Sequence, residues 1–175
     1  MRNRLFIIIL LGWLFCPMPE ALADWSTAQR LTWNSGDSHF PAMAIDSTDT
    51  IHVVWGDDTP GNGEIYYKRS SNGGTSWSTA QRITWTSGYS YSGAIAIDSS
   101  DAIHIAWNDY TPGAPEIYYK RSPDGGATWS PAKRLTWTSG GSYVPAIAAD
   151  SSSTIHIVWE DFTPGNWEIY YKKGN

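Results

Sequence analysis

The sequence contains almost no cysteine: one residue, Cys16, among 175. This excludes a disulfide framework, because no second thiol is present for pairing. No window of the sequence shows the 3.6-residue apolar period of an amphipathic helix either, which excludes a helical fold. The protein must therefore be a β structure held together by packing.

Basic residues are also scarce. After residue 23 the chain carries ten Lys and Arg against sixteen Asp and Glu, which gives a net charge of −6. Nucleic acid and anionic membrane surfaces both require a net basic face on their partner. We therefore expect neither nucleic acid nor a membrane as the main partner.

Long apolar runs are missing except for residues 5–15, which follow two arginines. The run is shorter than the roughly 20 residues that span a bilayer, and Ala-Leu-Ala follows it at the positions leading to Ala23. This pattern predicts a signal peptide at 1–23, cleaved near Ala23, and a secreted protein, extracellular or periplasmic, that begins at Asp24. A lipoprotein anchor at Cys16 is the alternative, but the bulky aromatic residues just before this cysteine count against it.

Internal repetition is the strongest feature that is present. The string "WSTAQRLTW" and its variants begin at Trp25, Trp77 and Trp129, and "EIYYK" begins at Glu64, Glu116 and Glu168. Both series have a gapless period of 52 residues. A strict period of this size with strand-like residues predicts a propeller or a solenoid, here one domain at 24–175 with repeats starting at 25, 77 and 129.

Each repeat contains four strand signals separated by turn residues. In the first full period they lie at 40–46, 50–57, 64–70 and 76–85, and each is rich in β-branched or aromatic residues. Four short antiparallel strands per repeat are one propeller blade, with the first strand at the central axis and the fourth outermost. We therefore expect an all-β fold, a β-propeller with three four-stranded blades per chain.

Three histidines, His52, His104 and His156, recur at the same point of the second strand. Ligands on three separate blades would lie too far apart to share one ion. We expect core histidines that are packed or hydrogen-bonded, and no metal or cofactor.

The strings "SSNGGTSW" at 70–77 and "SPDGGATW" at 122–129 resemble the Asp-box, or BNR repeat, of the sialidase superfamily. The resemblance covers nearly the whole chain after residue 23, since motif, strand order and blade length all agree. It implies that each box is a structural turn between the third and fourth strands, on the face opposite the active site. The turn residues are Ser70, Asn72, Gly74 and Trp77, with Ser122, Asp124, Gly126 and Trp129 in the second copy.

Two other interpretations of these strings are weaker. A calcium loop would need more acidic ligands than the single carboxylate, Asp124, that the two copies contain. Kelch repeats have a similar period and their own glycine pair, but here the glycines lie just before the fourth strand, inside the Ser-x-Asp context.

The resemblance implies sialidase chemistry only if the catalytic residues are present. Sialidases hold the substrate carboxylate with three arginines, the first of which lies in an inner strand, and use a tyrosine nucleophile with a glutamate partner and an aspartate acid/base. The matching inner strands, 40–46, 92–98 and 144–150, contain no arginine. We therefore expect a protein that is not an enzyme, and keep an exo-α-sialidase as the alternative.

If a ligand site exists, we expect it on the face that carries the loops between the second and third strands and those before the first strand. The candidate residues are Asp57, Asp109, Asp161, Tyr91, Tyr143, Trp33, Trp85 and Trp137. Aromatic faces beside carboxylates suit a neutral sugar. The alternative is that the tryptophans are core residues and the aspartates cap the Thr-Pro-Gly turns.

Counting strands from Trp25 gives three blades, with the strand that would finish the third blade placed first. Closed propellers usually have about 4 to 8 blades. We therefore expect a homodimer of two half-propellers that closes a six-bladed ring; a truncated fragment is the alternative. The predicted role is a binding or scaffold module whose partners are glycans or a secreted protein.

Overall fold

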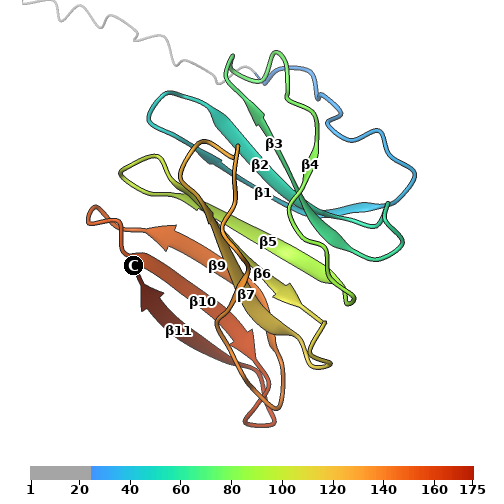
Figure 1. Cartoon of the computed structure of the whole chain (residues 1–175), viewed down its shortest axis with the longest axis vertical. Coiled ribbons are helices and arrows are strands. Elements are labelled where there is room, and N and C mark those ends of the chain that lie inside the picture. The colour runs from blue at the N-terminus through green and yellow to red at the C-terminus, as the bar shows by residue number, and fades with distance from the viewer. Residues whose placement is uncertain (1–24) are drawn as a thin grey trace, which may run out of the picture. The chain divides into compact units, whose positions relative to one another are not determined.

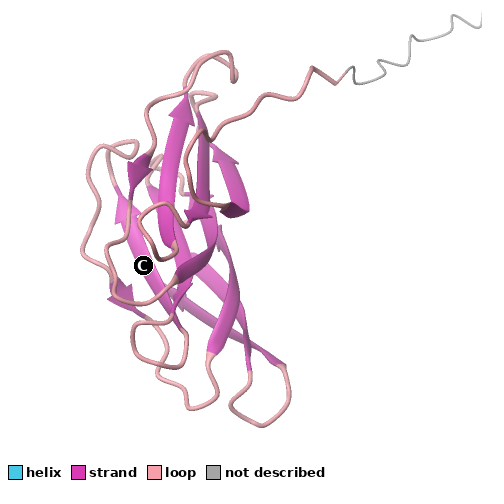
Figure 2. Ribbon diagram, turned by 90° about the vertical axis from the view of Figure 1, so that its right-hand side faces the viewer, coloured by secondary structure: helices cyan, strands magenta, loops and turns pink. Residues whose placement is uncertain are grey.

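The computed structural model describes residues 25–175, so the predicted signal peptide at 1–23, with Cys16, lies outside the described residues. The chain divides into one unit up to Arg30 and another from Leu31 onward, each described by itself. Eleven strands form the second unit, and the described residues contain no helix (Figure 2). A helix able to cross a membrane is likewise not found in residues 25–175.

The strands form three antiparallel sheets that follow one another along the chain, which we call the first, second and third blades (Figure 1). Their orders are β1-β2-β3-β4, β5-β6-β7-β8 and β9-β10-β11. The innermost strands, β1, β5 and β9, contact one another in series. The bounds are β1 Ser38–Ile45, β2 Ile51–Asp57, β3 Glu64–Ser70, β4 Gln81–Arg82, β5 Ser90–Ile97, β6 Ile103–Asp109, β7 Glu116–Ser122, β8 Lys133–Arg134, β9 Ser142–Ala149, β10 Ile155–Asp161 and β11 Glu168–Gly174.

The three inner strands of each blade agree with the prediction, and the strand expected at 64–70 is β3 to the residue. The fourth strand is shorter than expected, since within 76–85 only Gln81 and Arg82 pair with β3. The strand expected to begin at Trp25 is wrong for this structure, because residues 25–33 form no strand. Within the described residues the third blade therefore has three strands.

Side-chain hydroxyls account for the short fourth strand. The amide of Ile65 donates to Thr84 Oγ1 at 2.8 Å, and the amide of Arg69 donates to Ser78 Oγ at 3.1 Å. The second blade repeats both contacts. These hydroxyls accept the hydrogen bonds that main-chain carbonyls would accept in a full ladder, so the outer segment stays attached without regular strand geometry.

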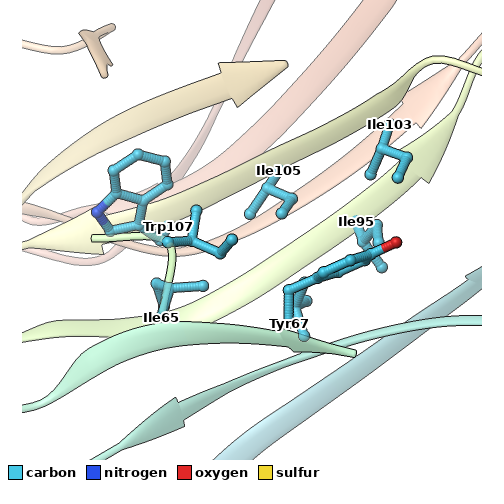
Figure 3. Close-up of a cluster of buried hydrophobic side chains, with 8 residues drawn as sticks. Ile65, Tyr67, Ile95, Ile103, Ile105 and Trp107 are labelled. Atoms are coloured by element: carbon cyan, nitrogen blue, oxygen red, sulfur yellow. The ribbon is translucent and has the colours of Figure 1, made fainter. Parts of the chain in front are cut away.

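Adjacent blades pack face to face through buried apolar side chains (Figure 3). The first joint contains Val54, Ile65, Tyr67, Ile83, Ile95, Ile103, Ile105 and Trp107. The second joint contains Ala106, Ile117, Ile155, Ile157 and Trp159. Each apolar cluster is shared by two blades, so these faces are stable only when another apolar surface covers them.

The three repeated histidines are hydrogen-bonded within their blades, as predicted. His52 Nδ1 lies 2.8 Å from the hydroxyl of Tyr67, and its Nε2 lies 3.1 Å from Oδ2 of Asp46. His104 and His156 make the same two contacts in their own blades. No group of His, Cys, Asp and Glu that could hold a metal ion occurs in residues 25–175.

Both Asp-boxes are turns that join the third strand of a blade to the fourth, as the resemblance implied. In the second box, Ser122 Oγ donates to Asp124 Oδ1 at 2.8 Å and accepts from the amide of Gly126 at 2.8 Å. In the first box, Ser70 Oγ makes the matching contacts with Asn72 and Gly74 at 3.0 Å each.

The second box also fastens the first two blades together. The hydroxyl of Tyr67 donates to the carbonyl of Gly125 at 3.2 Å, and the ring of Trp129 meets that of Tyr67 edge-on with centroids 5.4 Å apart. Gly126 lies directly against the same ring, since a Cβ at this position would be 2.4 Å from Tyr67 Cε1. The box is therefore a contact between blades as well as a turn.

Candidate functional site

The candidate site lies at the end of each blade opposite its Asp-box. In the first blade Ser38 pairs with Asp57, and Asp57 pairs with Glu64. The loop before β1 and the loop between β2 and β3 therefore meet at one edge of the sheet. The Asp-box follows Ser70, at the other end of β3, so these loops form the face on which we predicted a ligand site.

Asp57, Asp109 and Asp161 are buried inside these loops, with at most 1% of their surface exposed. The carboxylate of Asp57 accepts hydrogen bonds from Trp55 Nε1 at 2.9 Å and from the amide of Thr59 at 3.0 Å. Burial alone would raise its pKa, but the hydrogen bonds from Thr59 and Trp55 together hold the pKa below its usual value. These contacts recur in the other blades and favour the interpretation of the aspartates as turn caps.

Trp33, Trp85 and Trp137 are each 69% exposed. The alternative that they are core residues is therefore wrong, whereas the tryptophans of β2, β6 and β10 are buried. The side chains of Arg82 and Lys120 lie over the ring of Trp85, at 5.5 and 5.9 Å from its centroid. The same two kinds of cation flank Trp137 at 5.4 and 5.9 Å.

A cavity of about 250 Å³ opens beside Trp85, at the joint between the first and second blades. Its wall is largely apolar with a few hydroxyls, the usual composition of a small-ligand site. The lining residues are Thr84, Trp85, Thr86, Trp107, Asp109, Thr111, Tyr118, Lys120 and Ala132. The cavity therefore brings two of the predicted ligand residues, Trp85 and Asp109, to one place, although Asp109 is buried in its wall.

Positive and negative charges are balanced around this cavity. Arg82 Nη2 donates to Oε1 of Glu64 at 2.7 Å, and Glu64 is fully buried. Burial lowers the pKa of Lys120, whose Nζ donates to a carbonyl of the first blade at 2.8 Å. The carboxylates of Glu64 and of the buried Asp109 thus balance the charges of the two cations beside Trp85. The cavity therefore suits a neutral ligand better than an anionic one.

Tyr91 lies in a second aromatic cluster on the same face. Its hydroxyl donates to Asp58 Oδ1 at 2.9 Å across the first joint, and His39 Nε2 lies 3.4 Å from Asp58 Oδ2. The rings of Phe40 and Tyr89 flank that of Tyr91, with centroids 6.0 and 5.6 Å away. Burial and the hydrogen bond to the negative Asp58 raise the pKa of Tyr91 to about 12, so its hydroxyl stays protonated.

Tyr143 lies in the matching cluster at the second joint. Its ring centroid is 5.1 Å from that of Trp167 and 6.4 Å from that of Tyr110, and Phe162 also contacts Trp167. The amide of Tyr110 donates to the carbonyl of Tyr89 at 2.9 Å, so the two clusters lie next to each other, and we call them together the aromatic row. The predicted tyrosines therefore lie in this row and are not among the residues that line the cavity.

Sequence reasoning missed two groups of residues on this face. Tyr118 and Lys120 line the cavity but were not among the predicted ligand residues. Asp58 belongs to the aromatic row and could have been found from its variation between the repeats. The equivalent positions hold Asp58, Tyr110 and Phe162, although the residue before each of them is always aspartate. A position that varies between otherwise equal blades is not needed for the packing that all blades share, so it is a candidate for a role of its own.

Two arginines are paired with glutamates of their own blades, whereas Arg69 donates to the carbonyl of Gly125 in the next blade at 2.9 Å. Arg82 and Arg134 contact the buried Glu64 and Glu116 at 2.7 and 2.8 Å. The two pairs lie at the same point of the first and second blades and leave the two arginines in separate environments.

No protein-family model and no curated protein matches this sequence. Solved structures match in fold. The Hadza microbial sialidase Hz136 superposes with a TM-score of 0.62 at 12% identity, over 77% of this chain and 35% of that chain. The chain has the fold of a sialidase-type β-propeller.

Two other solved structures extend the comparison. The Penicillium chrysogenum alpha-L-arabinanase complexed with arabinobiose gives a TM-score of 0.54 at 13% identity, over 77% of this chain and 45% of that chain. The fucose lectin from Kordia zhangzhouensis in complex with methyl-fucoside gives 0.51 at 19% identity, over 77% of this chain and 93% of that chain. The chain thus spans less than half of the sialidase and the arabinanase, but nearly all of the lectin.

Proposed function

We propose that the protein is a secreted carbohydrate-binding propeller that holds a neutral sugar in the cavity beside Trp85 and at its repeats. The observation that carries this proposal is the equal exposure of Trp33, Trp85 and Trp137, at 69% each. Although cationic side chains lie over part of each ring, most of each indole's apolar surface remains in water, at a cost that a bound ligand would remove. The C–H face of a pyranose stacks on such a ring.

Polar groups around the indole can orient a sugar. Burial raises the pKa of the Tyr118 hydroxyl, which therefore remains a hydrogen-bond donor at neutral pH. The hydroxyls of Thr86 and Thr111 line the same cavity. A few fixed hydroxyls beside an aromatic face provide direction and specificity, and the balanced charge favours neutral sugars over sialic acid.

Hydrolysis is the competing function, because sialidases and arabinanases share the fold. A tyrosine nucleophile must be activated, but the pKa of Tyr91 is raised to about 12, and Asp58 holds its proton. Arg82 and Arg134 are paired with glutamates in separate blades. The protein should therefore release no dye from a fluorogenic sialoside above the uncatalysed rate. Saturable turnover of this substrate would show that the protein is an enzyme and would overturn the proposal.

A glycan array of neutral and acidic sugars tests the binding function, followed by calorimetry with neutral methyl glycosides, methyl-fucoside first. Trp85→Ala should remove one class of sites, and replacement of all three exposed tryptophans should abolish binding. Tyr89→Ala is the matched control, since this ring is 48% exposed in the aromatic row. An array without hits would favour a scaffold that binds another protein. Loss of binding only in Tyr89→Ala would show that the ligand binds at the aromatic row and not at the tryptophans.

A further inference from the structure

The outer edge of the third blade is uncovered in the described chain. All seven residues of β11 are exposed, whereas those of the equivalent β3 and β7 are buried or half-buried, except one in β3. The contrast is sharpest at one apolar position: Ile65 and Ile117 are 0% exposed and Ile169 is 72% exposed. An apolar strand with an open edge is a surface that another strand can join.

The contacts that a fourth strand would make are known from the other two blades. Arg82 contacts the buried Glu64, Thr84 Oγ1 accepts from Ile65, and the amide of Ile83 donates to the carbonyl of Ile65 at 2.7 Å. The second blade repeats all three contacts. Among the described residues no strand pairs with the free edge of β11.

Residues 25–33 have the sequence of a fourth strand, "WSTAQRLTW", one repeat before 77–85. Their last part already lies where the fourth strand of a preceding blade would lie. Lys68 Nζ of the first blade donates to the carbonyl of Leu31 at 2.7 Å, and lies 5.7 Å from the ring centroid of Trp33.

The other two joints show the same arrangement. Lys120 of the second blade donates to the carbonyl of Ile83 at 2.8 Å, and Lys172 of the third blade donates to that of Leu135 at 2.6 Å. In both cases the acceptor follows the fourth strand of the preceding blade. Leu31 and Trp33 therefore lie where the end of a fourth-strand segment would lie, but the blade of that segment is not among the described strands.

A cavity marks the place of one further side chain. In the second blade Trp129, at the start of the fourth-strand segment, packs on Tyr67 of the first blade. The equivalent place in the third blade is a cavity of about 190 Å³, whose wall includes Tyr119, Leu135, Ile155 and Ile157. The tryptophan one period before the first Asp-box is Trp25, which is 91% exposed.

We propose that residues 25–33 of a second copy of this chain complete the third blade. Arg30 of the partner subunit would pair with Glu168, and Trp25 of the partner subunit would fill the cavity beside Tyr119. Because each chain has one such segment and one such edge, two copies satisfy each other under two-fold symmetry. Two copies give six blades, within the usual range of about 4 to 8, whereas three would give nine.

The exposed faces at the two ends of the blade series support the same assembly. On the first blade Met43 and Ile45 are 58% and 54% exposed, and on the third blade Val158 and Tyr171 are 39% and 56% exposed. The equivalent of Val158 in the first blade, Val54, is fully buried against the second blade. Dimerisation would bury both end faces in joints like those within the chain.

The second copy also completes a sugar pocket. Ala132, beside the fourth strand of the second blade, forms part of the wall of the cavity at Trp85. Its equivalent at Trp137 would be Ala28 of the partner subunit, which occupies the same position of the 52-residue repeat as Ala132. The assembly itself does not rest on sugar binding: a monomer that binds a glycoside would overturn only the assembly.

Light scattering of the purified protein measures the assembly directly, with the mass of one chain taken from mass spectrometry of the same denatured sample. We expect about twice the mass of one chain; a monomer, a trimer or an open-ended series of species would overturn the proposal. Arg30→Glu and Glu168→Arg should each reduce the dimer at least tenfold, and the double variant should restore it. Dimers in all three variants, or no recovery in the double variant, would show that these residues do not meet.

Cysteine crosslinking distinguishes exchange between chains from pairing within one chain. The amide of Ser78 donates to the carbonyl of Arg69 at 2.9 Å, and the equivalent pair at the new joint is Ser26 with Lys173. Residues 24–175 contain no cysteine, so Ser26→Cys and Lys173→Cys chains each carry one thiol and should form a mixed disulfide when combined. Thr27→Cys in place of Ser26→Cys is the control. A yield no greater than in this control would contradict the proposed register.

Discussion

The hydroxyl of Tyr91 donates a 2.9 Å hydrogen bond to Oδ1 of Asp58, from one blade to the next. The bond crosses the joint at the face on which the loops gather, at the opposite end from the contact between Tyr67 and the second Asp-box. The first joint is thus closed by a tyrosine at each end, with the apolar cluster of Figure 3 between them.

Tyr91→Phe should weaken this joint without changing its shape. It removes one hydrogen bond to a partly exposed carboxylate, and the free energy of unfolding should fall by about 1 kcal/mol. Urea denaturation at pH 7 measures the loss, with Tyr89→Phe as the control. Equal losses in the two variants would show that the bond to Asp58 contributes nothing particular.

The same tyrosines predict how stability depends on alkaline pH. Burial, aided at Tyr91 by Asp58, raises the pKa values of Tyr67 and Tyr91 to about 12, whereas an unfolded tyrosine titrates near 10. The neutral forms are favoured in the folded state, so this stability is complete below pH 10 and lost as the pH rises through 12. Tyr91→Phe should make the alkaline loss shallower; an unchanged slope would contradict the assignment.

At acid pH the two Asp-boxes should differ. Hydrogen bonds from the side chain and amide of Thr128 lower the pKa of Asp124 to about 2. Its contribution is therefore present above pH 4 and lost as the pH falls through 2. Asn72 accepts the matching amide bond, from Ser76 at 2.9 Å, without ionising.

Exchanging these two residues gives a reciprocal test. Asp124→Asn should leave the protein folded at pH 7 and make its acid unfolding shallower, and Asn72→Asp should make it steeper. Circular dichroism between pH 2 and 6 would follow both, and parallel acid profiles for the two variants would rule out the assigned role of Asp124.

Gly126 should be the least replaceable residue of its box. An Ala side chain there would collide with the ring of Tyr67 and would also occupy a backbone with φ of +87°. Gly73→Ala, with φ of +64° and no atom within 4 Å of the new Cβ, should cost about 1 kcal/mol from backbone strain alone. Gly126→Ala should cost about 2 to 4 kcal/mol. Thermal unfolding measures the loss of stability in each variant. Equal losses would mean that the blades can move apart at Gly126 to make room for the new side chain.

Much of the fold could be predicted from the sequence because the 52-residue repeat shows the strand pattern of one blade three times. The third strands were placed to the residue, since a Thr-Pro-Gly turn and an Asp-box bound them on either side. The fourth strands could not be, because Ser78 and Thr84 bond to the main chain through their side chains, and a β-rich string does not reveal this.

The site was harder to predict for a related reason. Asp57 and Trp85 repeat equally well in the sequence, yet one is fully buried and the other is 69% exposed. Repetition shows that a residue has the same role in each blade, but not whether that role is packing or binding. Only the three-dimensional packing, which buries Asp57 beside Trp55 and leaves Trp85 at the rim, separates the two.

The most direct test of the proposed function is calorimetric titration of the protein with neutral methyl glycosides, methyl-fucoside first, alongside the variant in which Trp33, Trp85 and Trp137 are all alanine. We predict about three equivalent sites per chain, with at least tenfold weaker binding at each site whose tryptophan is replaced. No heat with any neutral glycoside, or the same isotherm in the triple variant, would contradict the account.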